Sequence, residues 1–117
     1  MTIHFSKQAL LQDATDFATR NHRVISQNMA NVNTPNYRTR QLSFEQFVEQ
    51  ATAKRKTSAD SVKLDVEISD ELAIRPDGNS VDLDAEVAKL KQNELYHQTL
   101  TQLMGSKIET MRNAMRR

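Results

Sequence analysis

NMANVNTPNY, residues 28–37, is where a long helical pattern stops and the chain has to turn. Pro35 disfavours helix at the residue before it, and the asparagines around it favour turns. We therefore expect one N-terminal helix over residues 6–33, with its regular part ending near Asn31. The remainder of the chain can then fold back along this helix.

The segment before the turn has the apolar spacing of an amphipathic helix. Two columns of apolar residues, which begin at Leu10 and Leu11, repeat every seven residues, as in helices that pack along their length. Polar residues such as Arg20 and Arg23 fall on the opposite side. The apolar arc consists of Leu10, Leu11, Ala14, Phe17, Ala18, Val24, Ile25 and Met29.

Two asparagines, Asn21 and Asn28, lie in the middle of this apolar arc. A buried asparagine costs stability, but it can fix the register between two packed helices. The alternative is that both residues are merely tolerated at a loosely packed seam.

The middle of the chain, residues 34–80, predicts smaller elements. Leu42, Phe44, Phe47 and Val48 have the spacing of a short helix of about three turns. The polar residues 53–61 are expected to form an exposed or disordered loop. Beyond that loop a strand or hairpin is predicted, and it needs a pairing partner. Its apolar positions, which alternate with polar ones, are Val62, Leu64, Val66 and Ile68.

A second long helix is expected over residues 81–117. Residues 75–79, Arg-Pro-Asp-Gly-Asn, predict a turn before it, and Asp82 or Ser80 is placed to cap it. Its apolar residues form two stripes that are rotated from one another, so a single antiparallel partner cannot cover both. We therefore expect neighbouring subunits to cover the rest. The C-terminal stripe consists of Leu100, Met104, Ile108, Met111 and Met115.

The composition limits what the chain can do. Of 117 residues, 38% are hydrophobic and 5% aromatic, with two Gly, two Pro and no Cys. This favours one small helical unit whose independent core is doubtful. The net charge of +1 gives no general attraction to nucleic acid or anionic lipid. No cleavable secretory signal is recognisable, and no apolar run is long enough to cross a bilayer.

The sequence predicts no catalytic, cofactor-binding or metal-binding residue. His4, His22 and His97 are scattered, and no phosphate-binding loop or hydrolase motif is present. Residues 77–84 superficially resemble a calcium loop, but the glycine is second instead of sixth, Val81 occupies a ligand position and the twelfth position is Ala88 instead of a glutamate. A turn followed by a helix cap explains them better. Short basic clusters at 38–40 and 54–56 are better explained as solvated loops than as a nucleic-acid surface.

The decapeptide at 28–37 resembles the N-terminal signature of flagellar rod and hook axial proteins, an N-x-A-N-x-x-T-P-x-Y pattern. The residues that match it, called the signature below, are Asn28, Ala30, Asn31, Thr34, Pro35 and Tyr37. Residues 77–84, followed by Glu86, Leu90 and Asn93, and residues 96–103 are similar to the smallest members of that family. Residues 50–70 match nothing diagnostic.

The resemblance implies a mainly α fold, in which the N- and C-terminal helices pair as an antiparallel coil. It also implies a structural subunit of the proximal rod in the bacterial flagellar basal body, exported uncleaved by the flagellar type III apparatus. The implied partners are other rod subunits, the rod–base junction protein, the membrane ring protein and further copies in a helical lattice.

The resemblance also assigns roles to individual residues. Asn28 and Asn31 would bond backbone groups where the helix ends, and Tyr37 would pack back over the junction. Phe44 and Val48 match a short F-x-x-x-apolar element for docking on the export gate, with core packing of the short helix as the alternative. A competing function is a small cytoplasmic helical adaptor or export chaperone, which would be folded on its own.

Overall fold

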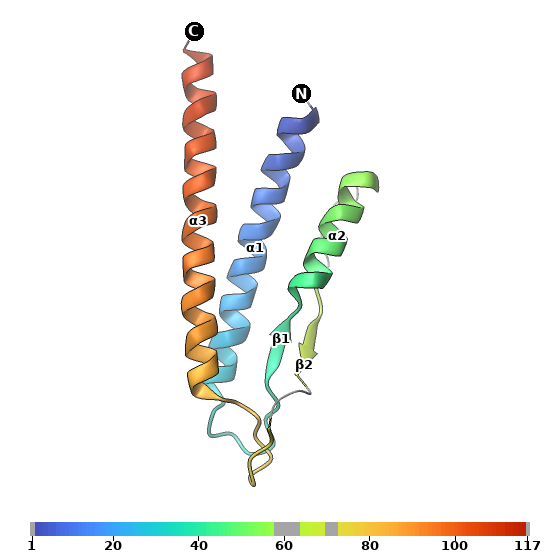
Figure 1. The fold of residues 1–117 in the computed structure, drawn as a ribbon, viewed down its shortest axis with the longest axis vertical. Coiled ribbons are helices and arrows are strands. Elements are labelled where there is room, and N and C mark those ends of the chain that lie inside the picture. Colours follow the sequence, from blue (N-terminus) through green and yellow to red (C-terminus); the bar gives the residue numbers. More distant parts are fainter. Residues whose placement is uncertain (1, 58–63, 70–72, 117) are drawn as a thin grey trace.

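The computed structural model describes residues 2–57, 64–69 and 73–116, which form two long helices, a shorter helix and a small hairpin (Figure 1). The molecule is elongated, with extents of 65 × 28 × 16 Å. The elements in chain order are α1 (Thr2–Ala30), β1 (Arg40–Leu42), α2 (Phe44–Thr57), β2 (Val66–Ile68) and α3 (Leu83–Met115).

The two long helices run antiparallel, as expected, and pack along a common seam (Figure 1). The side chain of Asn28 bonds to that of Glu86, and Asn21 bonds to Asn93. Ala14 and Leu100 lie in the same buried cluster one step further along the seam. Each step is seven residues on both helices. The seam positions of α1 thus repeat every seven residues, and they face positions of α3 with the same repeat.

The helix ends differ from the predicted ones. α1 begins at Thr2 and ends at Ala30, three residues before the predicted end, because residues 31–36 form consecutive turns. α3 begins at Leu83 because Asp82 is extended and its carboxylate accepts hydrogen bonds from the backbone N–H groups of Asp84 and Ala85. Of the two predicted caps, Asp82 is thus the one observed.

The middle region corrects two predictions. α2 continues to Thr57, so residues 53–57, expected in a loop, are helical, in keeping with the helix propensity of Ala, Lys and Arg. Leu42 belongs to β1 and not to the short helix, which starts after Ser43. The Ser43 hydroxyl accepts a bond from the N–H of Gln46, as an N-terminal cap does.

The predicted strand is present as β2, which pairs antiparallel with β1 in the register Arg40↔Ile68 and Leu42↔Val66. It is not half-buried as expected, since Val66 is 49% and Ile68 56% exposed. Leu64 packs against the core from outside the strand, and Val62 lies outside the described residues.

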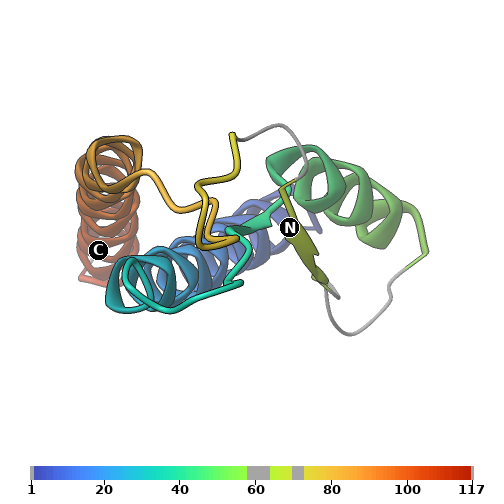
Figure 2. The same ribbon diagram turned by 90° about the horizontal axis from the view of Figure 1, so that it is seen from below.

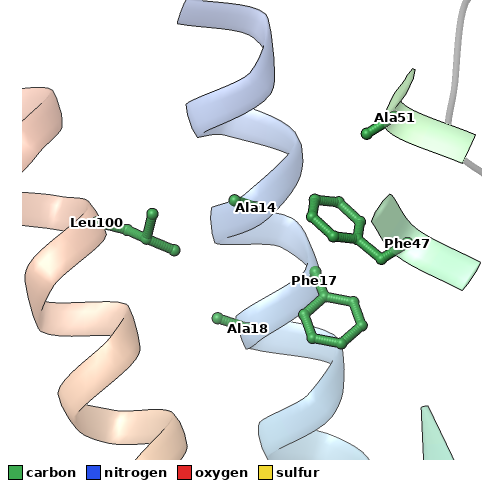
Figure 3. Close-up of a cluster of buried hydrophobic side chains, with 6 residues drawn as sticks. All are labelled: Ala14, Phe17, Ala18, Phe47, Ala51 and Leu100. Atoms are coloured by element: carbon green, nitrogen blue, oxygen red, sulfur yellow. The ribbon is translucent and has the colours of Figure 1, made fainter. Parts of the chain in front are cut away.

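The core lies on both flanks of α1, which is placed between α3 and α2 (Figures 1 and 2). Ala14 and Ala18 face Leu100 of α3, whereas Phe17 faces Phe47 of α2 (Figure 3). Half of the six buried residues in this cluster are alanines, so the few large side chains contribute most of its apolar area. The members are Ala14, Phe17, Ala18, Phe47, Ala51 and Leu100.

Candidate functional site

A buried polar network joins α1, α3 and the two loops at the foot of the helix pair, and it is the most specific feature of the structure. We call it the clasp, and it consists of Asn28, Tyr37, Thr39, Arg40, Asn79, Ser80 and Glu86.

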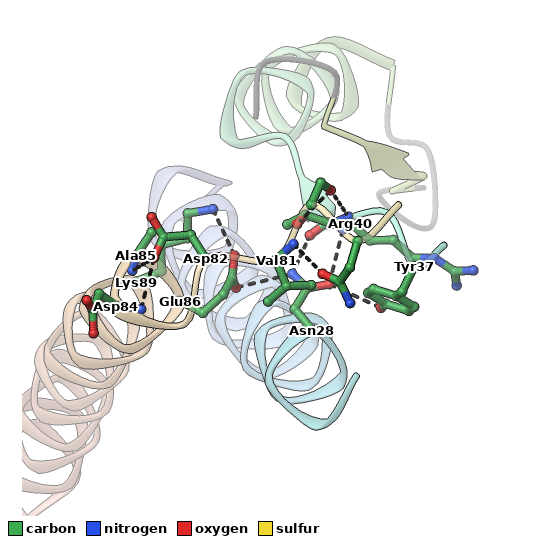
Figure 4. A network of polar contacts seen from close by, with 12 residues as sticks. Asn28, Tyr37, Arg40, Val81, Asp82, Asp84, Ala85, Glu86 and Lys89 are labelled. Carbon is green, nitrogen blue, oxygen red and sulfur yellow. Dashed lines mark hydrogen bonds and ion pairs between the residues drawn. The ribbon is translucent and has the colours of Figure 1, made fainter. Parts of the chain in front are cut away.

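Asn28 is the centre of the clasp and is only 1% exposed. Its Nδ2 donates to the Arg40 carbonyl at 2.7 Å and to Glu86 Oε2 at 3.1 Å (Figure 4). Its Oδ1 accepts from the Arg40 N–H at 3.1 Å and from the Tyr37 hydroxyl at 3.2 Å. One amide group thus holds the end of α1 to β1 through the backbone of Arg40, to α3 through the Glu86 carboxylate and to the signature loop through the Tyr37 hydroxyl.

Glu86 is completely buried in the first turn of α3. Its carboxylate accepts from Asn28 and pairs with Lys89 Nζ at 3.3 Å. Burying a carboxylate costs free energy unless it is paired and hydrogen-bonded. A shift of α3 along α1 would separate Glu86 from Asn28 and leave its buried carboxylate without that hydrogen bond. In the sequence Glu86 counts only among the residues that resemble the smallest family members, and no local pattern indicates its burial.

Asn79 holds the turns that follow α1 from a distant part of the chain. Its Nδ2 donates to the carbonyls of Asn31 at 2.9 Å, Val32 at 3.1 Å and Thr34 at 2.8 Å, while its Oδ1 accepts from the Val81 N–H at 2.7 Å. These carbonyls come after Ala30, the last residue of α1, so Asn79 fixes the turns that lead out of the helix. Sequence reasoning placed Asn79 only in a turn, because no local pattern reveals a partner that lies 48 residues away.

The two loops touch closely at Gly78. This residue has a φ of +82°, and a Cβ there would lie 2.3 Å from Oδ1 of Asn36, itself at a φ of 63°. Asn36 also donates its N–H to the Asp77 carbonyl at 2.9 Å. Gly78 is thus the residue that allows the signature loop and the loop before α3 to meet.

Thr39 and Ser80 form a second buried link between these loops. The Thr39 N–H donates to Ser80 Oγ at 2.8 Å, and the Ser80 hydroxyl donates to Thr39 Oγ1 at 3.2 Å. Ser80, the other predicted cap, therefore joins the loops instead of capping α3. No described buried side-chain N or O atom lacks a hydrogen-bond partner.

The remaining signature residues stay close to the end of α1. Asn31 Nδ2 donates to the Gln27 carbonyl at 2.7 Å, and its Oδ1 accepts from the Thr34 hydroxyl at 3.0 Å. Ala30 is the last residue of α1, and Pro35 is exposed in the turn. The structure thus brings Asn28, Asn31, Thr34 and Tyr37 into one bonded group.

Asn21 lies higher on the seam. Its Nδ2 donates to Asn93 Oδ1 at 3.1 Å, and Asn93 Nδ2 donates to the Ala18 carbonyl at 2.8 Å. Asn21 and Asn28 are thus bonded across the seam to Asn93 and Glu86, respectively. That they set register remains a prediction.

Phe44 and Val48 lie on the first turns of α2 and are 52% and 45% exposed. The Phe44 ring is 5.8 Å from that of Phe17 and 6.4 Å from that of Tyr96 on α3. Burial raises the pKa of the Tyr96 phenol. Phe47, and not Phe44, is the buried aromatic anchor of α2.

The C-terminal stripe leaves the core as it runs along α3. Leu100 is buried and Met104 accepts a weak bond from the Thr15 hydroxyl at 3.4 Å, but Ile108, Met111 and Met115 are 47%, 41% and 81% exposed. The described chain therefore packs only the first part of this stripe.

The two histidines whose side chains are described, His22 and His97, belong to no group of residues that could hold a metal ion. His22 and His97 line a shared groove with Glu94, whereas the side chain of His4 lies outside the described part of the chain. Among the described residues, no three His, Cys, Asp or Glu side chains are grouped to hold a metal ion. No described helix combines the length and apolarity that a membrane span requires.

The chain is similar to several curated proteins that share one name, flagellar basal body rod protein FlgB. The protein from Borrelia hermsii is 31% identical over 77% of this chain and 81% of its own length. That from Aeromonas hydrophila is 29% identical over 99% of this chain and 98% of its own length. That from Bacillus subtilis is 28% identical over 90% and 89% of the two chains. No protein-family model matches the chain.

Proposed function

Because the chain belongs to the FlgB family of flagellar basal body rod proteins, we propose that it is a structural subunit of the proximal part of the flagellar rod. Subunits of this kind act through contacts with their neighbours and catalyse no reaction. Packing of helices between successive subunits would build the shaft that transmits torque.

The observation that carries this proposal is the C-terminal stripe of α3. It begins at Leu100 inside the helix pair and continues to Met115 with its last three side chains 41–81% exposed. A soluble protein rarely leaves such a stripe bare unless a partner covers it. Contacts between non-equivalent surfaces of successive copies generate open tubes or filaments, as a rod requires.

The clasp supports the same function. It replaces apolar packing by directional hydrogen bonds at the foot of the helix pair, where Asn28 and Glu86 are 1% and 0% exposed. Such bonds are satisfied in one arrangement only, so they fix the angle and register of α1 against α3. A fixed geometry is what a torque-transmitting subunit needs from its inner helices.

We propose the neighbours of this subunit in the rod, and its route out of the cytoplasm, by analogy with the family. The proposed neighbours are other rod subunits, the rod–base junction protein and the membrane ring protein. The proposed route is uncleaved export through the flagellar type III apparatus, with Phe44 and Val48 as the segment that docks on its gate.

Deletion of the gene tests the proposal. Cells without it should lose rod, hook and filament while the membrane ring remains, and the unaltered gene should restore motility. A Glu86→Ala variant should restore it poorly because Asn28 and Lys89 lose their shared partner. Arg23→Ala, on the exposed polar side of α1, is the matched control and should restore it fully. A complete rod in the deletion strain would disprove the function.

A further inference from the structure

We infer that an apolar furrow between α2 and α3 receives the C-terminal part of α3 from a second copy of this chain. The inference rests on the proposed function and makes it specific, since it names the two surfaces that meet.

The furrow consists of two adjoining cavities of about 400 and 310 Å³ that share Tyr96 as a wall. Phe17 and Ala14 of α1 form its floor, and Phe44 and Val48 of α2 form the opposite wall. α1 packs directly against both α2 and α3 and lies between them (Figure 2). The furrow is lined by residues of all three helices. It is an apolar surface that the described chain leaves open, with Phe44 52% and Val48 45% exposed.

The C-terminal part of α3 is long enough to cover it. From Met104 to Met115 the stripe spans twelve residues, which is about 18 Å of helix, whereas the furrow follows α2 from Phe44 to Thr52, nine residues or about 14 Å. The same stripe already packs on α1 at Leu100, where it forms part of the intramolecular core. Its continuation is therefore a helix face with the chemistry of a core and no cover within the described chain.

Charge favours this occupant and sets its direction. The end of α3 carries Lys107, Arg112 and Arg116 against one acid, Glu109. The first half of α2 carries Glu45 and Glu49, whereas its basic residues 54–56 lie in the last turn. The incoming helix end should therefore point towards the start of α2. Lys89, which lines the furrow at that end, is already paired with Glu86.

One chain thus carries both the groove and the helix that fits it. Because these are different surfaces, each copy can donate its α3 to one neighbour and accept that of another, and the chain of contacts stays open. A second copy accounts for both bare surfaces at once, whereas a different partner would account for only one of them.

Cross-linking of the full chain tests the contact, because the natural sequence has no cysteine. Val48→Cys and Met111→Cys proteins are purified separately, mixed and treated with a short bismaleimide. Both positions are at least 41% exposed, so neither substitution disrupts the core. The control mixture contains Val48→Cys and Arg23→Cys proteins, since position 23 lies on the polar side of α1. We expect the yield of mixed covalent dimer from Val48→Cys and Met111→Cys to be roughly tenfold higher than that from the control mixture.

The outcomes separate the contact from the function. If the Met111→Cys protein alone gives covalent dimers in the same yield as the mixture, the contact is a symmetric one between helix ends, and the inference is overturned. A mixed yield no higher than the Arg23→Cys control would also overturn it, even if deletion of the gene abolishes the rod. If the mixed dimer forms but the deletion strain still builds a rod, the contact stands and the rod function falls.

Discussion

Truncation of two aromatic residues on α2, Phe44→Ala and Phe47→Ala, separates the export role from the packing role. The two rings lie three positions apart and contact one another, with centroids 6.0 Å apart. They differ in exposure, since Phe47 is 4% and Phe44 52% exposed. Only Phe44 belongs to the proposed export motif with Val48. Each role therefore predicts a different order of severity for the two variants.

The structure gives the size of the packing effect. Phe47 stacks at 5.0 Å on Phe17 within the buried cluster, so its truncation should cost about 3–5 kcal/mol. Phe44 keeps about half of its surface in water, so its truncation should cost roughly half as much, about 1.5–2.5 kcal/mol. If packing alone matters, Phe47→Ala is the more damaging change in every assay.

An export role would reverse this order, because the gate would read the chain before it folds. In a strain that exports but cannot assemble its rod, we expect Phe44→Ala to remain in the cytoplasm at normal total abundance. Phe47→Ala should be secreted at the wild-type level and fail only later, at assembly. The measurement is the ratio of secreted to cell-retained subunit.

Normal secretion of Phe44→Ala in that strain would refute the export role. Equal retention of both variants would refute it too, since the defect would then follow the loss of an aromatic side chain and not the motif. Val48→Ala is the companion change and should reproduce the retention, because Val48 is the second position of the motif and is 45% exposed.

Three further predictions follow from the seam and the clasp. Asn79→Ala should destabilise the folded chain by about 2–4 kcal/mol, because three carbonyls lose their donor, and urea unfolding of the assembled protein should detect it; an unchanged midpoint would contradict this. Asn21→Leu should leave association equal or higher. Because Asn93 loses its hydrogen bond from Asn21 across the seam, electron microscopy should nevertheless show misassembled rods, and fully normal motility would contradict the register role. The isolated monomer should show weak amide-exchange protection, because half of its core cluster is alanine; a sharp two-state thermal transition would contradict this.

The local pattern of the sequence was sufficient to predict the two long helices. Their antiparallel pairing was predicted by the family resemblance. The heptad columns of α1 depend on residues that are neighbours along one helix, and Pro35 and Asp82 act on the backbone within a few residues. Such effects can be read without knowing the rest of the fold. The same reasoning failed at residues 53–57, where a polar composition predicted a loop but helix propensity extended α2.

Tertiary structure alone decided which polar residues became structural. Asn79 holds the turn that follows α1, 48 positions earlier, and Glu86 is buried only because Asn28 and Lys89 meet it there. It also decided that Phe47 is core while Phe44, three residues away in the same apolar cluster, stays half in water. Burial and hydrogen-bond partners depend on which elements approach one another in space. That is set by the register between distant segments, which the spacing within any one segment does not contain.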